Sequence, residues 1–283
     1  MNTAALDRYA VIGYPVKHSR SPFIHGMFAK QTDQKLTYQL LEVAPEYLAN
    51  EVEKFFAEGG KGLNITVPHK QAVVGLVKYC TPRAELAGAV NTILVMEDGA
   101  LMGDNTDGIG LLNDLNHNLK FELQDKRILI LGAGGAARGV LAPLLQQQPT
   151  ELVVANRNVE RATELVKEFQ NLGALRAASF ADVGNEAFDL IINATSASLQ
   201  GEMPEVPDSV IGDNTLCYDM AYGKDDTVFT HWAKELGAAY AVQGWGMLVE
   251  QAAESFYLWR NVRPDTIPVL VALQNPPPPR PAL

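Results

Sequence analysis

The sequence predicts an α/β protein with two domains, and three observations lead to this prediction. Short apolar runs rich in β-branched residues alternate with segments of helical apolar spacing, a pattern typical of mostly parallel sheets covered by helices. One of these runs leads directly into a glycine-rich turn that opens a helix. The chain has 283 residues, whereas an average domain has roughly 150.

The N-terminal third of the chain alternates between strand and helix patterns. β-branched and aromatic residues mark the strands, and apolar residues three or four positions apart mark the helices. We expect strands at 9–13, 36–43, 62–67, 91–95 and 100–103, and helices at 22–31, 47–58 and 71–79.

The same alternation resumes beyond a helical segment at 107–120, which we expect to form the domain boundary. The last long helix, at 247–261, is expected to pack back on the first domain. The prediction is one domain of residues 1–106 plus 247–283 and another of residues 107–246, with a cleft between them. We expect strands at 127–132, 151–156, 189–195 and 215–220, helices at 136–147, 159–171 and 228–236, and an extended tail, QNPPPPRPAL, because proline lacks the amide donor.

The composition excludes several classes of protein. The net charge is 23 − 33 = −10, so an excess of positive charge for nucleic acid or an anionic membrane is missing. Two cysteines, Cys80 and Cys217, are too few for a disulfide framework or a cysteine-rich zinc site, and we expect no metal. No segment reads as a signal peptide or has the ~20 unbroken apolar residues of a membrane span. We expect a cytoplasmic protein.

The glycine-rich unit RILILGAGGAARG predicts a dinucleotide site. Gly132 permits a tight turn after the strand, and Gly134 lets backbone amides approach a pyrophosphate. Ala137 is small enough for close packing of the helix, whose N-terminus favours negative charge. The strand before, the helix after and a further strand at 151–156 make this signal stronger than a lone glycine pattern.

The end of the second strand in this unit indicates which nucleotide binds. A free ribose 2′-hydroxyl is usually bound by an acidic residue about 20 positions after the glycines. This chain instead has Asn156-Arg157-Asn158 and then Arg161. Two guanidiniums suit a 2′-phosphate, which favours NADP over NAD. The alternative is a pair of solvated surface arginines, one of which starts a helix.

Polar clusters in the first domain follow predicted strands, where parallel-sheet proteins place ligands. Ser19 and Ser21 precede a helix and could hold a carboxylate; the alternative, capping of the helix by Ser21, explains one serine but not the whole run. Asn64 and Thr66 share one face of a strand, and Lys70 follows on the next turn. A lone lysine is usually a solvated charge. Only the polar residues that accompany Lys70 in the sequence indicate that it belongs to a site.

Further polar residues lie at predicted strand ends or on the last long helix. Asn91 could be a plain turn residue, and Asp107 a plain acid in the first turn of a helix. Tyr222 ends the motif YDMAY. Gln251 could be an ordinary amide on a helix surface.

Together these residues resemble one family, the shikimate dehydrogenases, over nearly the whole chain. The signatures that carry the resemblance are GYPVKHSRSP, NITVPHK, GAVNT, DNTDG, GAGGAARG, NRNVERA, NATS, YDMAY and GMLVEQA. The resemblance implies a substrate domain followed by a Rossmann-type NADP-binding domain. It also implies reversible NADPH-dependent reduction of 3-dehydroshikimate to shikimate in chorismate and aromatic amino-acid biosynthesis.

The resemblance assigns roles residue by residue. Lys70 and Asp107 match the catalytic pair, and Ser19 and Ser21 match the serines that bind the substrate carboxylate. The remaining substrate contacts implied are Asn64, Thr66, Asn91, Tyr222 and Gln251, and the cofactor contacts implied are Gly132, Ala133, Gly134, Gly135, Ala136, Asn156, Arg157, Asn158, Arg161, Thr195, Met220 and Gly244.

Two departures from the family pattern stand out. Gly26 follows His25 where asparagine is usual, and Ala197-Ser198 stands where Ser-Gly is usual. Neither departure removes a group that the chemistry needs, but the second lies near the predicted cofactor site.

Two other functions stay open at this point. One is a quinate/shikimate dehydrogenase that uses NAD, against which Arg157 and Arg161 argue. The other is a non-catalytic NADPH-binding sensor, for which loss of Lys70 or Asp107 would be expected. The partner expected is a small-molecule substrate, with neither nucleic acid nor membrane, and a homodimer is compatible with the sequence.

Overall fold

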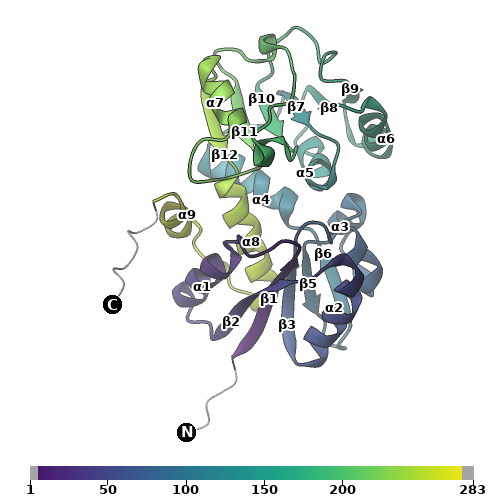
Figure 1. Ribbon diagram of the computed structural model, residues 1–283, viewed down its shortest axis with the longest axis vertical. Coiled ribbons are helices and arrows are strands. Elements are labelled where there is room, and N and C mark those ends of the chain that lie inside the picture. The colour runs from purple at the N-terminus through teal and green to yellow at the C-terminus, as the bar shows by residue number, and fades with distance from the viewer. Residues whose placement is uncertain (1–5, 276–283) are drawn as a thin grey trace. The chain divides into compact units, whose positions relative to one another are not determined.

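The computed structural model describes residues 6–275, which divide into two compact units. Unit 1 contains the described residues up to Thr106 and those from Leu248 onward, and unit 2 contains Asp107–Met247. Figure 1 labels most of the helices and strands of both units. The proline-rich tail expected from the sequence lies outside the described residues from position 276 onward.

Unit 1 is built on a six-stranded sheet in the order β2-β1-β3-β5-β6-β4. Most of its strand pairs are parallel, but β5 runs antiparallel to both of its neighbours. The strands are β1 (Asp7–Gly13), β2 (Leu36–Glu42), β3 (Gly60–Ile65), β4 (Tyr79–Cys80), β5 (Thr92–Val95) and β6 (Leu101–Asp104).

Two hydrophobic clusters form the core of unit 1. Helix α2 (Leu48–Ala57) buries Leu48, Val52 and Phe55, whose spacing puts them on one helix face, against residues of the sheet. The second cluster joins α1 (Ser21–Gln31) to α8 and α9 (Ile267–Gln274). Helix α8 (Trp245–Arg260) therefore places residues such as Gln251 within unit 1.

Unit 2 is built on a six-stranded sheet in the order β12-β11-β10-β7-β8-β9, with every pair parallel. Its strands are β7 (Arg127–Leu131), β8 (Glu151–Ala155), β9 (Leu175–Ala178), β10 (Leu190–Asn193), β11 (Leu216–Asp219) and β12 (Tyr240–Gln243). Its helices are α4 (Asp107–Asn113), α5 (Gly135–Leu145), α6 (Val159–Phe169) and α7 (Val228–Glu235).

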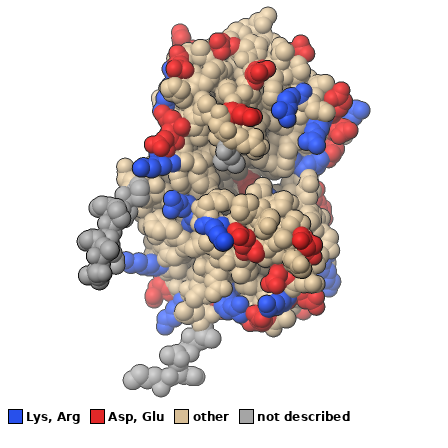
Figure 2. All heavy atoms as spheres, viewed as in Figure 1, with Lys and Arg blue, Asp and Glu red and all other residues tan. Residues whose placement is uncertain are grey.

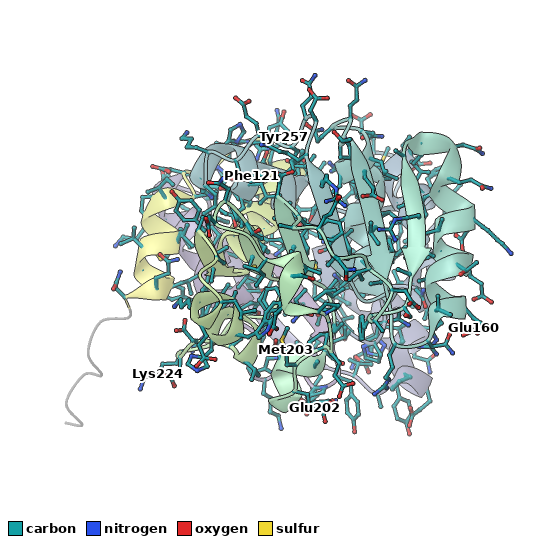
Figure 3. The ribbon with its side chains drawn as sticks, turned by 90° about the horizontal axis from the view of Figure 1, so that it is seen from above. Phe121, Glu160, Glu202, Met203, Lys224 and Tyr257 are labelled. Atoms are coloured by element: carbon teal, nitrogen blue, oxygen red, sulfur yellow. The ribbon has the colours of Figure 1, made fainter. Side chains whose placement is uncertain are left out.

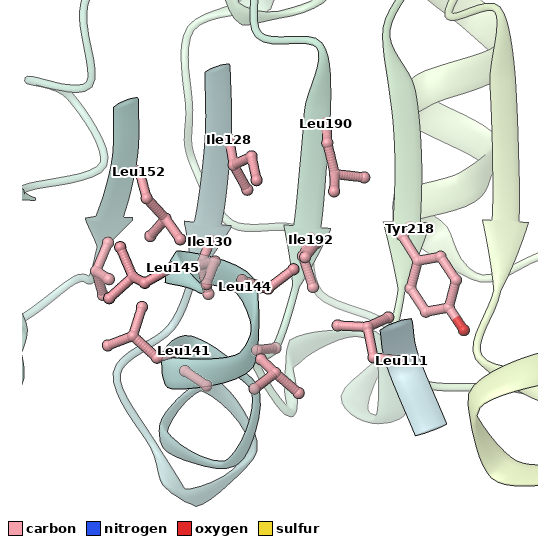
Figure 4. Packing of buried hydrophobic residues seen from close by; sticks show 14 of the residues in the cluster. Leu111, Ile128, Ile130, Leu141, Leu144, Leu145, Leu152, Leu190, Ile192 and Tyr218 are labelled. Atoms are coloured by element: carbon pink, nitrogen blue, oxygen red, sulfur yellow. The ribbon is translucent and has the colours of Figure 1, made fainter. Parts of the chain in front are cut away.

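Both faces of the unit 2 sheet are covered. Ile128 and Ile130 of β7 point into the cluster that contains the apolar residues of α5, as Figure 4 shows. Leu129 and Leu131 alternate with them and belong to a cluster that includes residues of α7. Burial on both faces explains why the strand reads as a continuous apolar run in the sequence.

Short elements account for the errors of the sequence-based prediction. The helix expected at 71–79 is instead a 3₁₀ turn over Ala72–Leu76 followed by β4, because Gly75 and adjacent valines disfavour an α-helix. The helical segment at 107–120 contains α4 and then a π-helical turn at Asp114–Asn118. The sequence did not predict β4, β9, β12, α9 or α3 (Pro82–Ala87).

The surface carries charges of both signs. On the face shown in Figure 2, acidic and basic side chains are interspersed and do not separate into fields of one sign. Within residues 6–275, no helix is long and apolar enough to cross a membrane.

Candidate active site

The glycine-rich turn of unit 2 leaves space for a ligand against the backbone. Gly132 follows β7 with φ of +105°, a conformation that favours glycine, and a Cβ there would lie 3.1 Å from the Ala194 carbonyl oxygen and Thr195 Cγ2. A Cβ on Gly134 or Gly135 would meet no atom within 4 Å. Helix α5 begins at Gly135, so its free amides face this open space. The turn therefore fits a dinucleotide pyrophosphate.

The neighbouring alanines of the turn differ in burial. Ala133 is half-buried against the core, Ala136 is exposed, and Ala137 is fully buried. The small side chain of Ala137 allows α5 to pack closely on the sheet, as the sequence predicts.

The segment after β8 presents two arginines. Asn156 Nδ2 donates to the Asn158 carbonyl oxygen (2.8 Å), and Asn158 Oδ1 accepts from the Arg161 amide (3.1 Å), which caps α6. Arg157 and Arg161 are both exposed, and neither forms an ion pair with another residue in the described part of the chain. Their guanidiniums are therefore available to a phosphate group.

The ends of β10, β11 and β12 bring three more predicted cofactor residues to this edge of the sheet. Thr195 lies against Gly132, as the Cβ distance above shows. The Met220 amide donates to the Asn193 carbonyl oxygen (3.0 Å), and the Gly244 amide donates to that of Ala221 (3.1 Å). A Cβ on Gly244 would lie 2.5 Å from the Met220 carbonyl oxygen, so only glycine fits there.

In unit 1, Ser19 and Ser21 lie together at the start of α1. The Ser19 hydroxyl donates to Ser21 Oγ (3.2 Å), and the Ser21 amide donates to Ser19 Oγ (3.3 Å). Arg20 occupies the N-cap position, and no side chain caps the helix. Ser21 therefore does not cap the helix, whereas the Ser19 hydroxyl oxygen accepts from the amide of the first helical residue.

A tyrosine that the sequence analysis missed bonds to Asn64. The Tyr38 hydroxyl donates to Asn64 Oδ1 (2.7 Å). Burial raises the pKa of Tyr38, and the nearby Ser21 hydroxyl has a smaller effect in the opposite direction. The bond from Tyr38 holds the side-chain oxygen of Asn64, a predicted substrate residue. The place of Tyr38 in a regular strand pattern gave no signal of this role.

Asn64 is held on its other side by three oxygens. Its Nδ2 atom lies 3.2 Å from the Asn91 carbonyl oxygen, 3.2 Å from Thr92 Oγ1 and 3.0 Å from Ser255 Oγ. These contacts fix the orientation of the amide, because only the nitrogen can donate to a carbonyl.

His25 stacks on the Tyr38 ring, with centroids 4.3 Å apart and planes 6° from parallel. The imidazole is 1% exposed, and its Nε2 atom has no hydrogen-bond partner among the described residues. Burial lowers the pKa of His25 to about 3, against a smaller effect of the nearby Asn64 side chain that raises it. The imidazole is therefore neutral at physiological pH.

The segment that leads to Asp107 is tied to Asn91 and Gln251. Asn91 Nδ2 donates to Thr106 Oγ1 (2.9 Å), and Asn91 Oδ1 accepts from the Thr106 amide (2.9 Å). The Thr106 hydroxyl also donates to the Gln251 carbonyl oxygen (3.1 Å). The sequence analysis missed Thr106, although it is the residue before Asp107.

The remaining predicted residues are partly or fully enclosed. Lys70 is half-buried, and its carbonyl oxygen accepts from the Val90 amide (2.8 Å), next to Asn91. Thr66 follows β3 and continues its pairing through a bond from its amide to the Ile12 carbonyl oxygen (2.9 Å). In unit 2, Asp107 begins α4 and is 6% exposed. The Tyr222 ring lies 4.5 Å from that of Trp245.

Comparison with known proteins identifies the family. Residues 11–93 match the shikimate dehydrogenase substrate binding domain, residues 114–206 match shikimate / quinate 5-dehydrogenase, and residues 244–270 match the shikimate 5'-dehydrogenase C-terminal domain. The chain is 52% identical over 269 residues to shikimate dehydrogenase (NADP(+)) of Cellvibrio japonicus, covering 95% of this chain and 97% of that relative. The chain belongs to the shikimate dehydrogenase family.

Solved structures agree with this family and with the fold. An Ael1 enzyme from Pseudomonas putida is similar with a TM-score of 0.89 and 45% identity, over 95% of this chain and 99% of that one. Shikimate 5-dehydrogenase of Thermus thermophilus, in complex with NADP(H) and shikimate, has a TM-score of 0.85 and 32% identity, over 94% and 98%. The family resemblance and the two-domain α/β fold class predicted from the sequence are confirmed.

The comparisons do not assign individual residues, so the roles given above stay predictions. Within the described part of the chain, no group of three or more histidine, cysteine or carboxylate side chains could hold a metal ion.

Proposed function

We propose that this protein is an NADP-dependent oxidoreductase that acts on a CH–OH group and interconverts 3-dehydroshikimate and shikimate. The balanced reaction is 3-dehydroshikimate + NADPH + H⁺ ⇌ shikimate + NADP⁺, a step of chorismate and aromatic amino-acid biosynthesis. The observation that carries the proposal is the polar network of unit 1 that runs from Tyr38 through Asn64 and Asn91 to Gln251, together with the Ser19–Ser21 pair at the start of α1. Its hydroxyls and amides suit a ligand with one carboxylate and several ring hydroxyls.

The two serines at the start of α1 bind the substrate carboxylate. Their hydroxyls and the amides of the first helical turn are donors, and the helix N-terminus favours negative charge. Thr66, Asn64, Asn91, Gln251 and Tyr222 surround the ring and its hydroxyls. An analogue that lacks these hydroxyls would leave polar groups of the site unpaired, which is the basis of the specificity.

Lys70 and Asp107 are the residues responsible for proton transfer. NADPH, when bound, supplies the hydride for the C3 carbonyl carbon. The Lys70 ammonium stabilises negative charge on the C3 oxygen and donates the proton during reduction, and the neutral amine accepts it during oxidation. Asp107 orients Lys70 and the neighbouring substrate hydroxyl.

The nucleotide is held by unit 2. The turn from Gly132 to Gly135 and the start of α5 receive the pyrophosphate, and Arg157 and Arg161 receive the 2′-phosphate. Thr195, Met220 and Gly244 line the same edge of the sheet.

The test is absorbance at the NADPH band with purified protein, in which shikimate and quinate are each combined with NADP⁺ and with NAD⁺. We expect rapid turnover with shikimate and NADP⁺ alone. Comparable turnover of quinate, or a preference for NAD⁺, would place the protein with the broader quinate/shikimate enzymes. NADPH binding without any turnover would instead indicate a sensor.

We place this activity in the cytoplasm, with a small molecule and neither nucleic acid nor membrane as partner. Two cysteines, too few for a disulfide framework, are typical of a protein from a reducing compartment. A homodimer is a further proposal, and sedimentation velocity would decide between one chain and two.

A further inference from the structure

Asp219, at the end of β11, is a fully buried carboxylate at the cofactor edge of the unit 2 sheet. Its Oδ2 atom accepts from the hydroxyls of Ser198 (2.7 Å) and Thr227 (2.6 Å). Its Oδ1 atom accepts from Asn193 Nδ2 (3.2 Å) and from the Ala221 amide (3.0 Å). The carboxylate therefore joins three segments: the one after β10 with Ser198, the one after β11 with Ala221, and the start of α7 with Thr227.

Asn193 extends this cluster to Thr195. Its Oδ1 atom accepts from the Thr195 amide (3.1 Å) and the Thr195 hydroxyl (2.7 Å). Its Nδ2 atom also donates to Ser198 Oγ (3.0 Å). The Ser198 hydroxyl thus accepts from Asn193 and donates to Asp219, and it closes a ring of hydrogen bonds around the start of the 195–200 segment.

The position of this segment matters because Thr195 lies against Gly132 of the glycine-rich turn. In Figure 3, Glu202 and Met203 mark the chain just beyond this segment, and Lys224 marks the loop that follows β11. A shift of Thr195 would change the space beside the turn that receives the pyrophosphate. Ser198 is also the residue at which the sequence departs from the family pattern of glycine, so the hydroxyl is a feature of this chain.

We propose that Ser198 is a positioning residue: by joining Asp219 to Asn193, its hydroxyl holds the 195–200 segment, with Thr195, in the arrangement that receives NADPH. The proposal rests on the proposed function, because it takes the glycine-rich turn to be the nucleotide site. Its physical basis is that a hydrogen bond to a carboxylate is stronger than one between neutral groups.

The chain offers a matched control at the same carboxylate oxygen. Ser198→Ala and Thr227→Ala each remove one hydroxyl donor from Asp219 Oδ2. Thr227, however, accepts from the Thr230 amide (3.1 Å) and caps α7, whereas Ser198 holds the segment beside the glycine-rich turn. Ser198→Thr keeps a hydroxyl at this position and serves as the conservative rescue.

The first measurement is NADPH binding by the whole protein, followed by nucleotide fluorescence. Ser198→Ala should raise the Kd about tenfold, the effect of roughly 1.4 kcal/mol, while kcat at saturating NADPH changes less than twofold. Thr227→Ala and Ser198→Thr should leave the Kd within about twofold. An equal loss of affinity in both alanine variants, or no loss in Ser198→Ala, would overturn the proposal.

The second measurement needs no nucleotide. Hydrogen exchange in the free protein should be faster at the Thr195 and Ala197 amides in Ser198→Ala, and faster only in the first turn of α7 in Thr227→Ala. Unchanged protection of Thr195 in Ser198→Ala would refute the positioning role. If the unaltered protein failed to bind NADPH, the proposed function would fail, and this exchange result would still decide whether Ser198 orders the segment.

Discussion

At the scale of single residues, Lys70 carries the most direct prediction. Lys70→Ala should lower kcat about 10²–10⁴-fold, the usual range for loss of acid–base help, and change the shikimate KM much less. Steady-state kinetics of shikimate oxidation measures both constants. Lys78→Ala is the control, because Lys78 is an exposed lysine of the same unit paired with Asp98 (3.6 Å). An unchanged kcat in Lys70→Ala would remove Lys70 from the mechanism.

Arg157 tests the choice of nucleotide. Arg157→Ala should weaken NADPH binding by about one to two orders of magnitude, since a hydrogen bond to a charged group contributes about 1.5–3 kcal/mol, and should leave NADH binding nearly unchanged. Titration of both nucleotides by fluorescence gives the two Kd values. Lys167→Ala removes a positive charge from the last turn of α6 and should affect neither. Equal losses for NADPH and NADH would contradict the 2′-phosphate assignment.

Tyr38 tests the hydrogen-bond network around Asn64. Tyr38→Phe keeps the ring against His25 but leaves the buried Asn64 Oδ1 atom without the Tyr38 donor, which costs about 1–3 kcal/mol. We therefore expect a lower midpoint of urea unfolding and a higher shikimate KM. Tyr47→Phe alters an exposed tyrosine of the same unit and should change neither quantity. An unaltered KM in Tyr38→Phe would separate this network from substrate binding.

At the scale of elements, the turn after β6 depends on Arg83, which pairs with Asp104 (2.6 Å) and also with Glu254 (3.1 Å). Asp104 is 1% exposed and accepts from Arg83 Nε and Nη2, both at 2.6 Å, from the Thr81 hydroxyl (2.6 Å) and from the Asn105 amide (2.7 Å). Arg83→Met would leave a buried carboxylate without its cation, and we expect a loss on the order of 2–4 kcal/mol in urea unfolding. Arg8→Met breaks an exposed pair with Glu58 and should cost less than about 1 kcal/mol. A similar small loss in both variants would show that the two ion pairs of Arg83 add no stability.

Local patterns predicted the elements whose signal lies within a few neighbouring residues. The run from Arg127 to Gly139 shows strand, turn and helix in succession, and the structure places β7, the open turn and α5 there. The sequence did not reveal β4, a two-residue strand whose pairing depends on β6 rather than on its own composition.

Such local patterns cannot predict the side-chain network of the site, because the network joins distant parts of the chain. Asn64 bonds to Ser255, 191 positions away, and Asn91 to Gln251, 160 positions away. The sequence analysis selected Asn64, Asn91 and Gln251 singly, from their strand ends and from the family resemblance. The connecting residues, Tyr38 and Ser255, carry no local signal, since each fits an ordinary strand or helix pattern.

At the scale of the whole molecule, His25 links the stability of the protein to pH. Burial lowers its folded pKa to about 3, whereas an unfolded histidine titrates near 6.5. Between these values the unfolded chain binds a proton at His25 that the folded chain does not, so stability is retained above pH 6.5 and lost as the pH falls. Lowering the pH from 6.5 to 5 should cost about 1.5 kcal/mol from this group alone.

Urea unfolding at both pH values measures this loss, in a range where most carboxylates stay ionised. His25→Phe keeps an aromatic ring beside Tyr38 and removes the titrating group, so its stability should fall by about 1.5 kcal/mol less than that of the unaltered protein over the same interval. His231→Phe is the control, because His231 lies on the exposed side of α7 beside Glu235 and should leave most of the pH dependence in place. The same pH dependence in His25→Phe as in the unaltered protein would contradict this prediction. It would show that the buried, stacked imidazole of His25 takes up its proton in the folded state as readily as in the unfolded chain.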